Sequence, residues 1–169
     1  MICTSVDIRV RYAETDAMGV VYHGNYLPWF EIARIALLDK AGLSYRELDD
    51  AGFLLPVLEA NVKYLAPARF DDVVCVTATM AEMPRVRIRI DYEVTLAGKV
   101  ITRGHTLHAF MDRQARAIKP PPVVLERLGA AFAQWERTNE GEGPPATNTP
   151  PRARPCRLPT SCIPRPRSI

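Results

Sequence analysis

An apolar stretch from Gly24 to Ala41 sets the first limit on how this chain can fold. Its large apolar residues recur at three- and four-residue spacings and cover most sides of the predicted helix, as is typical of a helix buried within a core. Pro28 is tolerated only in the first turn, where its missing N–H has no partner in any case. We therefore expect the helix to begin near Gly24 or Asn25, with Asn25 as its cap, and to stop at Gly42.

The sequence on either side of this helix predicts strands. Residues 5–12 alternate in character, and this places Val6, Ile8, Val10 and Tyr12 on one face of a half-buried strand. Further strands are predicted at residues 54–64, 72–81, 85–94 and 99–111, the last two joined by a turn at Ala97-Gly98. A short amphipathic helix then follows three prolines, with an apolar stripe of Val124, Leu125, Leu128, Phe132 and Trp135.

The predicted order is a strand, a long buried helix, four strands and a terminal helix. Because strands and helices do not alternate as βαβ units, we expect a mostly antiparallel sheet and an α+β fold class. One curved sheet would lie against one long helix in a single domain, residues 1–137. The remaining residues, 138–169, are rich in Pro, Thr and Arg and are predicted to form a disordered tail.

The net charge of +3 is unevenly distributed between these two parts. The tail contains five Arg and two acidic residues, so it accounts for the whole excess and the body is neutral. A neutral body lacks the basic surface that nucleic-acid binding requires. The tail is compatible with binding to an acidic surface or a membrane, and equally with an extension that has no function.

The chain contains no apolar run of the about 18 residues that a membrane span requires. Residues 1–11 also lack the basic start and apolar stretch of a signal peptide, so we expect a cytoplasmic protein without a transmembrane segment. The four cysteines form no CxxC pair, and His105 and His108 point to opposite faces of a predicted strand. Neither group therefore indicates a metal site.

The loop before the long helix contains the residues best suited to chemistry. Asp16, His23 and Gly24 lie where the unpartnered N–H groups of a helix start can bind an oxyanion. A carboxylate beside such N–H groups can attack a bound carbonyl, or activate water to attack it. This arrangement suits acyl transfer, with hydrolysis as the simplest case. By spacing alone, a helix cap and a surface contact are the commoner roles for such an Asp and His.

The segment Tyr12–Arg34 resembles the signature of the hotdog-fold acyl-CoA thioesterases. It is most similar to the 4-hydroxybenzoyl-CoA thioesterase family and its tol-pal-associated acyl-CoA thioesterase branch. The matching residues are Tyr12, Thr15-Asp16, Gly19-Val20-Val21-Tyr22-His23, Tyr26, Phe30-Glu31 and Ala33-Arg34. The similarity in element order extends over residues 1–136.

This resemblance implies a sheet wrapped around one central helix and assigns roles to the residues of the loop. Asp16 would be the catalytic nucleophile or general base, and the backbone N–H of His23 or Gly24 would hold the thioester oxygen. The side chains of His23 and Tyr12 would support catalysis. Helical spacing separately predicts an ion pair between Glu31 and Arg34, which is three residues further along the helix.

The resemblance also implies a substrate and an assembly. The substrate would be a short-chain or aromatic acyl-CoA, with acyl-carrier protein as an alternative thiol carrier and no metal or redox cofactor. The candidate contacts to coenzyme A phosphates are Arg85, on a basic strand face, and Arg116 and Lys119.

An open sheet edge predicts pairing into a homodimer or homotetramer, which in hotdog domains places the site at the interface. A non-catalytic acyl-CoA sensing module and a hotdog hydratase or dehydratase stay open as alternatives.

Overall fold

The computed structural model describes residues 1–139, which form one sheet and three α helices. The elements are β1 (Ile2–Arg9), α1 (Tyr26–Lys40), α2 (Tyr45–Asp50), β2 (Val57–Tyr64), β3 (Val73–Met80), β4 (Arg87–Leu96), β5 (Lys99–Met111), β6 (Ala117–Ile118) and α3 (Pro122–Asn139). Two short 3₁₀ turns, η1 (Tyr12–Glu14) and η2 (His23–Asn25), lie between β1 and α1. The predicted tail lies outside the described residues from position 140 onward.

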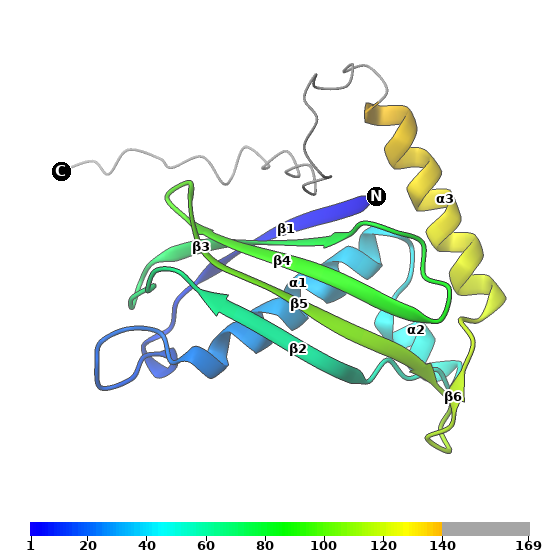
Figure 1. Cartoon of the computed structure of the whole chain (residues 1–169), viewed down its shortest axis with the longest axis horizontal. Helices are drawn as coiled ribbons and strands as arrows, with labels where there is room; N and C mark the ends of the chain where they lie inside the picture. The colour runs from blue at the N-terminus through cyan, green and yellow to red at the C-terminus, as the bar shows by residue number, and fades with distance from the viewer. Residues whose placement is uncertain (140–169) are drawn as a thin grey trace.

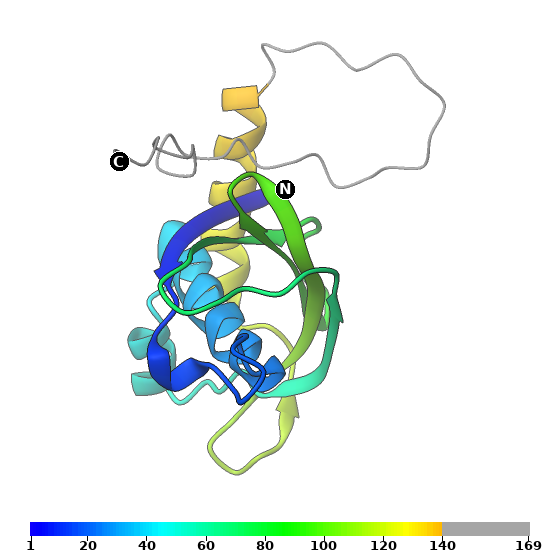
Figure 2. The same ribbon diagram turned by 90° about the vertical axis from the view of Figure 1, so that its left-hand side faces the viewer.

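The strands pair antiparallel in the order β1-β3-β4-β5-β2, and β6 pairs with the end of β5. Figures 1 and 2 show this sheet curving around α1, so that the helix lies in the concave side. The predicted α+β class, the antiparallel pairing and the element order are therefore confirmed. None of the helices within residues 1–139 is long and apolar enough to cross a membrane.

The helix packs closely on the sheet because one glycine leaves room for an aromatic ring. Phe30 of α1 stacks on Tyr92 of β4 with ring centroids 4.2 Å apart and the planes parallel to within 1°. Next to them, a Cβ added to Gly104 of β5 would meet Phe30 Cε2 at 2.8 Å and also the carbonyl oxygen of Asn61. This close approach fixes how deeply α1 sits in the sheet.

The alternation of apolar and polar residues over positions 85–94 is the strongest pattern in the sequence, and the structure reproduces it well. Ile88, Ile90, Tyr92 and Val94 of β4 are all buried, as their alternation predicts, whereas Val86 precedes the strand and is exposed. Ala97 and Gly98 both have positive φ, which is the geometry of a tight hairpin turn, and β5 has the predicted bounds.

Tyr12 differs from its prediction. The first strand ends at Arg9, and Tyr12 begins η1 instead of joining the buried face that contains Val10. The carboxylate of Glu14 accepts a hydrogen bond from the backbone N–H of Arg11 at 2.7 Å and so folds the chain into a turn at this point. The alternation of apolar residues through position 12 does not reveal that a side-chain hydrogen bond replaces strand pairing here.

Two elements were not predicted, and one helix is longer than predicted. The helix α2 has six residues and β6 has two, which is too short for a periodic pattern. The terminal helix α3 has 18 residues, and Val124, Leu128 and Phe132 of its apolar stripe are buried. Leu125 of the same stripe lies at the exposed margin.

We predict that Gly104→Ala lowers the free energy of unfolding by about 1–3 kcal/mol, because the added methyl overpacks against the Asn61 carbonyl of β2 and the Phe30 ring of α1. Gly129→Ala is the matched control, since a Cβ at Gly129 meets nothing within 4 Å and α3 gains helix propensity there. Urea unfolding followed by circular dichroism measures both. Equal stability of the two variants would contradict the packing argument.

Candidate active site

A tight hairpin presents Asp16 at one end of the molecule. The Asp16 N–H donates to the Val20 carbonyl at 2.9 Å, and the Gly19 N–H donates to the Asp16 carbonyl at 2.9 Å. Gly19 has a φ of +71°, which favours glycine at this position of the turn. The Asp16 side chain is half-buried, and its Oδ1 accepts the Met18 N–H at 2.8 Å. The carboxylate is thus held by its own turn and remains accessible.

The buried carboxylate of Glu14 anchors this hairpin to α1. It accepts hydrogen bonds from the Arg11 backbone N–H at 2.7 Å, the Arg11 guanidinium at 3.0 Å and the Trp29 indole N–H at 3.1 Å. Burial raises the pKa of Glu14, but the hydrogen bonds from Arg11 and Trp29 outweigh it and lower the net pKa below its ordinary value. Glu14 is therefore ionised and fully hydrogen-bonded at neutral pH.

The backbone of Glu14 holds the other strand of the hairpin and the start of the helix. Its carbonyl accepts the Tyr22 N–H at 2.9 Å and the Asn25 side-chain amide at 2.7 Å. Asn25 occupies the predicted N-cap position, but the prediction that its side chain caps the helix is wrong because Glu14 binds that amide. Hydrogen bonds to Glu14 thus join the loop with Asp16 to the helix start.

The first turn after this loop offers two backbone donors. The Asn25 N–H bonds to the Tyr22 carbonyl, and the Tyr26 N–H bonds to the carbonyls of Gly24 and His23. Within residues 1–139, the N–H groups of His23 and Gly24 have no hydrogen-bond acceptor. They lie directly before α1, and the family resemblance predicts that His23 or Gly24 supplies the donor to the thioester oxygen.

Aromatic rings surround these donors. The Tyr22 ring lies 4.3 Å from that of His23, and Tyr64 of β2 contacts both His23 and Tyr26, with centroids 6.4 Å and 5.1 Å apart. The Tyr64 hydroxyl donates a hydrogen bond to the His23 carbonyl at 2.8 Å. Neither Tyr64 nor Glu14 is indicated as a site residue by the sequence motifs.

The structure brings together only some of the predicted site residues. Asp16, His23 and Gly24 share the segment at one end of the sheet, shown in blue in Figure 1, although no hydrogen bond joins Asp16 to His23 among residues 1–139. Tyr12 is 78% exposed and its ring packs edge-on against Phe70, with centroids 5.7 Å apart. Its supporting role in catalysis stays a prediction.

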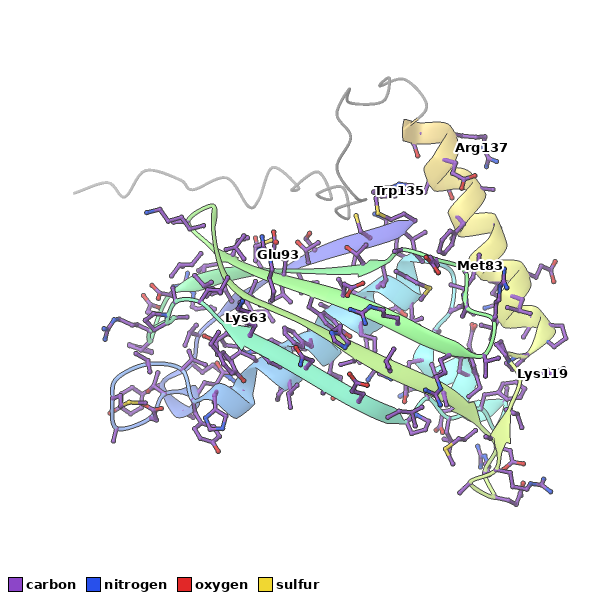
Figure 3. The ribbon with its side chains drawn as sticks, in the orientation of Figure 1. Lys63, Met83, Glu93, Lys119, Trp135 and Arg137 are labelled. Carbon is purple, nitrogen blue, oxygen red and sulfur yellow. The ribbon has the colours of Figure 1, made fainter. Side chains whose placement is uncertain are left out.

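The three candidate coenzyme A contacts lie at the opposite end of the chain's own sheet. Arg85 is on the connection between β3 and β4, two residues after the labelled Met83 in Figure 3, and Lys119 is labelled beside the start of α3. Arg116 follows β5 and forms an ion pair with Asp112 at 2.7 Å. A single chain therefore does not place these cations beside Asp16.

The predicted ion pair between Glu31 and Arg34 is not formed within the described residues. The Arg34 guanidinium turns inward and lies over the Tyr45 ring at 5.5 Å, whereas Glu31 is exposed.

The expectation that His105 and His108 face opposite sides is confirmed, because His105 bonds to Glu59 and His108 is buried against Thr106. Burial, aided by the charge of Arg34, lowers the pKa of His108 to about 4, so this imidazole is neutral.

An antiparallel sheet around one helix, with a carboxylate on the loop before that helix, is the arrangement expected of a hotdog thioesterase. The chain belongs to the thioesterase-like superfamily, whose family model matches residues 10–128. A solved DHNA-CoA thioesterase from Staphylococcus aureus is 33% identical, with a TM-score of 0.72, covering 84% of this chain and 97% of that one.

Two further relatives have names that describe thioester hydrolysis. The 1,4-dihydroxy-2-naphthoyl-CoA hydrolase of Synechococcus elongatus is 27% identical over 119 residues, which is 69% of this chain and 88% of that protein. The acyl-CoA thioester hydrolase YbgC of Escherichia coli is 37% identical over 76 residues, which is 45% of this chain and 57% of that protein. The predicted family resemblance is thereby confirmed.

We predict that Glu14→Gln lowers the free energy of unfolding at pH 7 by about 1.5–3 kcal/mol, because it removes hydrogen bonds to a charged acceptor. The folded-state pKa of Glu14 is lowered, so its contribution is fully present above the ordinary value of 4.5 and is lost as pH falls through the folded pKa. Urea unfolding between pH 7 and pH 3 should show stability falling more steeply in the wild type. If the free energies of unfolding of the wild type and of Glu14→Gln changed with pH in parallel, this would contradict an ionised, hydrogen-bonded Glu14.

Proposed function

We propose that this protein hydrolyses acyl-CoA thioesters, with Asp16 as the nucleophile or general base. One observation supports this most strongly: Glu14 ties the Asp16 hairpin to a helix start where two N–H groups have no acceptor within residues 1–139. Membership of the thioesterase-like superfamily, and relatives named as CoA thioester hydrolases, support the same reaction.

In this proposal the thioester oxygen accepts hydrogen bonds from the His23 and Gly24 N–H groups. These donors polarise the carbonyl and stabilise the negative charge that develops on its oxygen during attack. By the general-base route, Asp16 takes a proton from water as the water oxygen bonds to the acyl carbon. The carbon–sulfur bond then breaks, and the departing coenzyme A thiolate takes up the proton.

By the nucleophilic route, an Asp16 oxygen bonds to the acyl carbon and coenzyme A leaves, forming a mixed anhydride that water then hydrolyses. Both routes consume one water and release the free acid and coenzyme A. A carboxylate and backbone N–H groups suffice for either route, so we expect no cofactor beyond the coenzyme A of the substrate. The predicted cytoplasmic location stays a prediction.

The exposed rings of Tyr22 and Tyr64 favour a short-chain or aromatic acyl group. Both rings pack against His23, next to the proposed donors, and offer flat apolar surfaces to an acyl group held there. Relatives named for 1,4-dihydroxy-2-naphthoyl-CoA are consistent with an aromatic substrate. Acyl-carrier protein is an alternative thiol carrier.

We also propose that the protein works as a homodimer joined through β2. This strand is an edge of the sheet and seven of its eight residues are exposed, including Val57 and Leu58. An open, partly apolar edge is a template for another strand. If two copies pair antiparallel about Asn61, Glu59 of each copy faces Lys63 of the other, so the strand is self-complementary in charge.

This pairing would also complete the site. In Figure 1, β2 runs from the end of the sheet that has Lys119 toward the end that has the Asp16 hairpin. An antiparallel partner would therefore bring its own Arg85, Arg116 and Lys119 toward the Asp16 end of this chain. Within one chain these cations lie far from Asp16. The pairing resolves this, because the cations of the second copy would bind the phosphates of a coenzyme A whose acyl group lies at Asp16. A homotetramer of such dimers is a further prediction.

We predict that Asp16→Asn lowers kcat for acyl-CoA hydrolysis by on the order of 10²–10⁴-fold, because the amide can neither take a proton nor attack as a carboxylate does. Asp39→Asn, an exposed change at the far end of α1, should leave activity unchanged. Thiol release detected colorimetrically over a panel of acyl-CoA esters measures both variants. A folded Asp16→Asn with normal turnover would contradict the role of Asp16, and binding without turnover by the wild type would favour a sensing module.

We predict that Lys63→Glu weakens the dimer by about ten- to thirtyfold, since two unfavourable acid pairs form across the symmetric edge. The swapped variant Glu59→Lys/Lys63→Glu restores opposite charges and should restore the dimer. Light scattering across a micromolar dilution series reports the mass. A wild-type monomer at these concentrations, or no recovery in the swapped variant, would contradict pairing in this register.

A further inference from the structure

Tyr64 connects the edge strand to the peptide that precedes Gly24. It is the last residue of β2, and its hydroxyl donates a hydrogen bond at 2.8 Å to the carbonyl of His23, 41 residues earlier in the chain. Its ring also packs edge-on against Tyr26, with centroids 5.1 Å apart. The ring contact holds the side chain in place, so that the hydroxyl meets one particular backbone oxygen.

That oxygen belongs to the same peptide unit as the Gly24 N–H. A peptide bond is planar, and in its trans form the carbonyl and the N–H point to opposite sides of the chain. None of the peptide bonds described in this structure is cis. A hydrogen bond that fixes the direction of the His23 carbonyl therefore fixes the direction of the Gly24 N–H as well.

We infer that Tyr64 is a positioning residue for thioester hydrolysis, holding the His23–Gly24 peptide so that the Gly24 N–H faces the thioester oxygen. This inference rests on the proposed function, in which that N–H stabilises the oxyanion. Loss of an oxyanion donor costs on the order of 10²–10³-fold in kcat, and loss of its alignment costs a part of this. We expect about a tenfold loss when the hydroxyl is absent.

The geometry separates this role from direct catalysis and from simple packing. The Tyr64 hydroxyl proton is engaged by the His23 carbonyl, so Tyr64 does not itself donate to the substrate. The Tyr26 N–H also bonds to the His23 carbonyl, so the helix start persists when the hydroxyl is removed. The ring contacts with Tyr26 and His23 are kept by phenylalanine.

The test is Tyr64→Phe in the full-length protein, with Tyr45→Phe as the matched control. The Tyr45 hydroxyl forms no hydrogen bond among residues 1–139, and its ring lies beside Arg34. Tyr64→Phe should lower kcat about tenfold, with KM changed less than about twofold and an unchanged melting temperature, whereas the control should match the wild type. Wild-type kcat in a folded Tyr64→Phe would overturn the inference.

Two inhibitors separate positioning from a general loss of binding. A trifluoromethyl ketone analogue of an acyl-CoA forms a tetrahedral hydrate that resembles the oxyanion intermediate, whereas a coenzyme A thioether has no carbonyl next to its sulfur and so offers no oxygen to the Gly24 N–H. Tyr64→Phe should weaken inhibition by the ketone about tenfold and leave inhibition by the thioether unchanged. Equal weakening of both would show that Tyr64 acts only through packing and would overturn the inference.

A third measurement does not depend on activity. In protein labelled with ¹⁵N-glycine, the amide signal of Gly24 should shift in Tyr64→Phe, because the preceding carbonyl has lost a hydrogen bond, and should not shift in Tyr45→Phe. An unshifted Gly24 signal would overturn the inference even if turnover fell. Asp16→Asn separates a failure of the proposed function from a failure of the inference about Tyr64. Full activity of Asp16→Asn would contradict the proposed function. An inactive Asp16→Asn together with a fully active Tyr64→Phe would contradict only the role of Tyr64.

Discussion

The buried carboxylate of Glu14 is the interaction on which the geometry of the site depends. Its side chain binds Arg11 and Trp29, and its carbonyl binds Tyr22 and Asn25. A buried carboxylate without these donors would be strongly unfavourable, so the loop and the helix start must come together for Glu14 to be buried at all. The same residue therefore holds the Asp16 hairpin next to the turn that contains the His23 and Gly24 N–H groups.

The sheet supplies the second constraint, because it decides where this unit lies. Phe30 stacks on Tyr92 beside Gly104, and this contact sets the depth of α1 in the concave face. The start of α1 consequently lies near the end of β2, where Tyr64 reaches the His23 carbonyl. A core contact and an edge-strand hydroxyl thus both determine the direction of a backbone N–H. If the edge also pairs with a second copy, assembly and site geometry are coupled through the same strand.

Much of the fold could be predicted because its signals are local and periodic. The alternation of Ile88, Ile90, Tyr92 and Val94 predicts a strand that buries one face, and Ala97-Gly98 predicts the hairpin turn that follows. The alternating pattern places Tyr12 wrongly, because it continues past the point where the Glu14 carboxylate bends the backbone. A competing side-chain hydrogen bond of this kind leaves no trace in hydrophobic periodicity.

The candidate site was predictable in part, for a related reason. Asp16, His23 and Gly24 form a contiguous pattern that resembles a known family, so a single segment identifies them. Glu14 lies in the same segment, but a charged residue gives no sign that it is buried, and its partner Trp29 is 15 residues away. Tyr64 is 41 residues from His23, and the pairing of β2 with β5 together with the packing of α1 on the sheet brings the two together. Arg34 was assigned to Glu31 by helical spacing, whereas packing against Tyr45 draws it inward.

The most direct measurement is a crystal structure of Asp16→Asn with an intact aromatic acyl-CoA. We predict that the thioester oxygen lies about 2.7–3.1 Å from the backbone nitrogen of Gly24 or His23, with the substituted side chain facing the acyl carbon. A thioester bound with its carbonyl oxygen away from both nitrogens would contradict the proposed oxyanion site. The same would follow if residue 16 were out of reach of the acyl carbon.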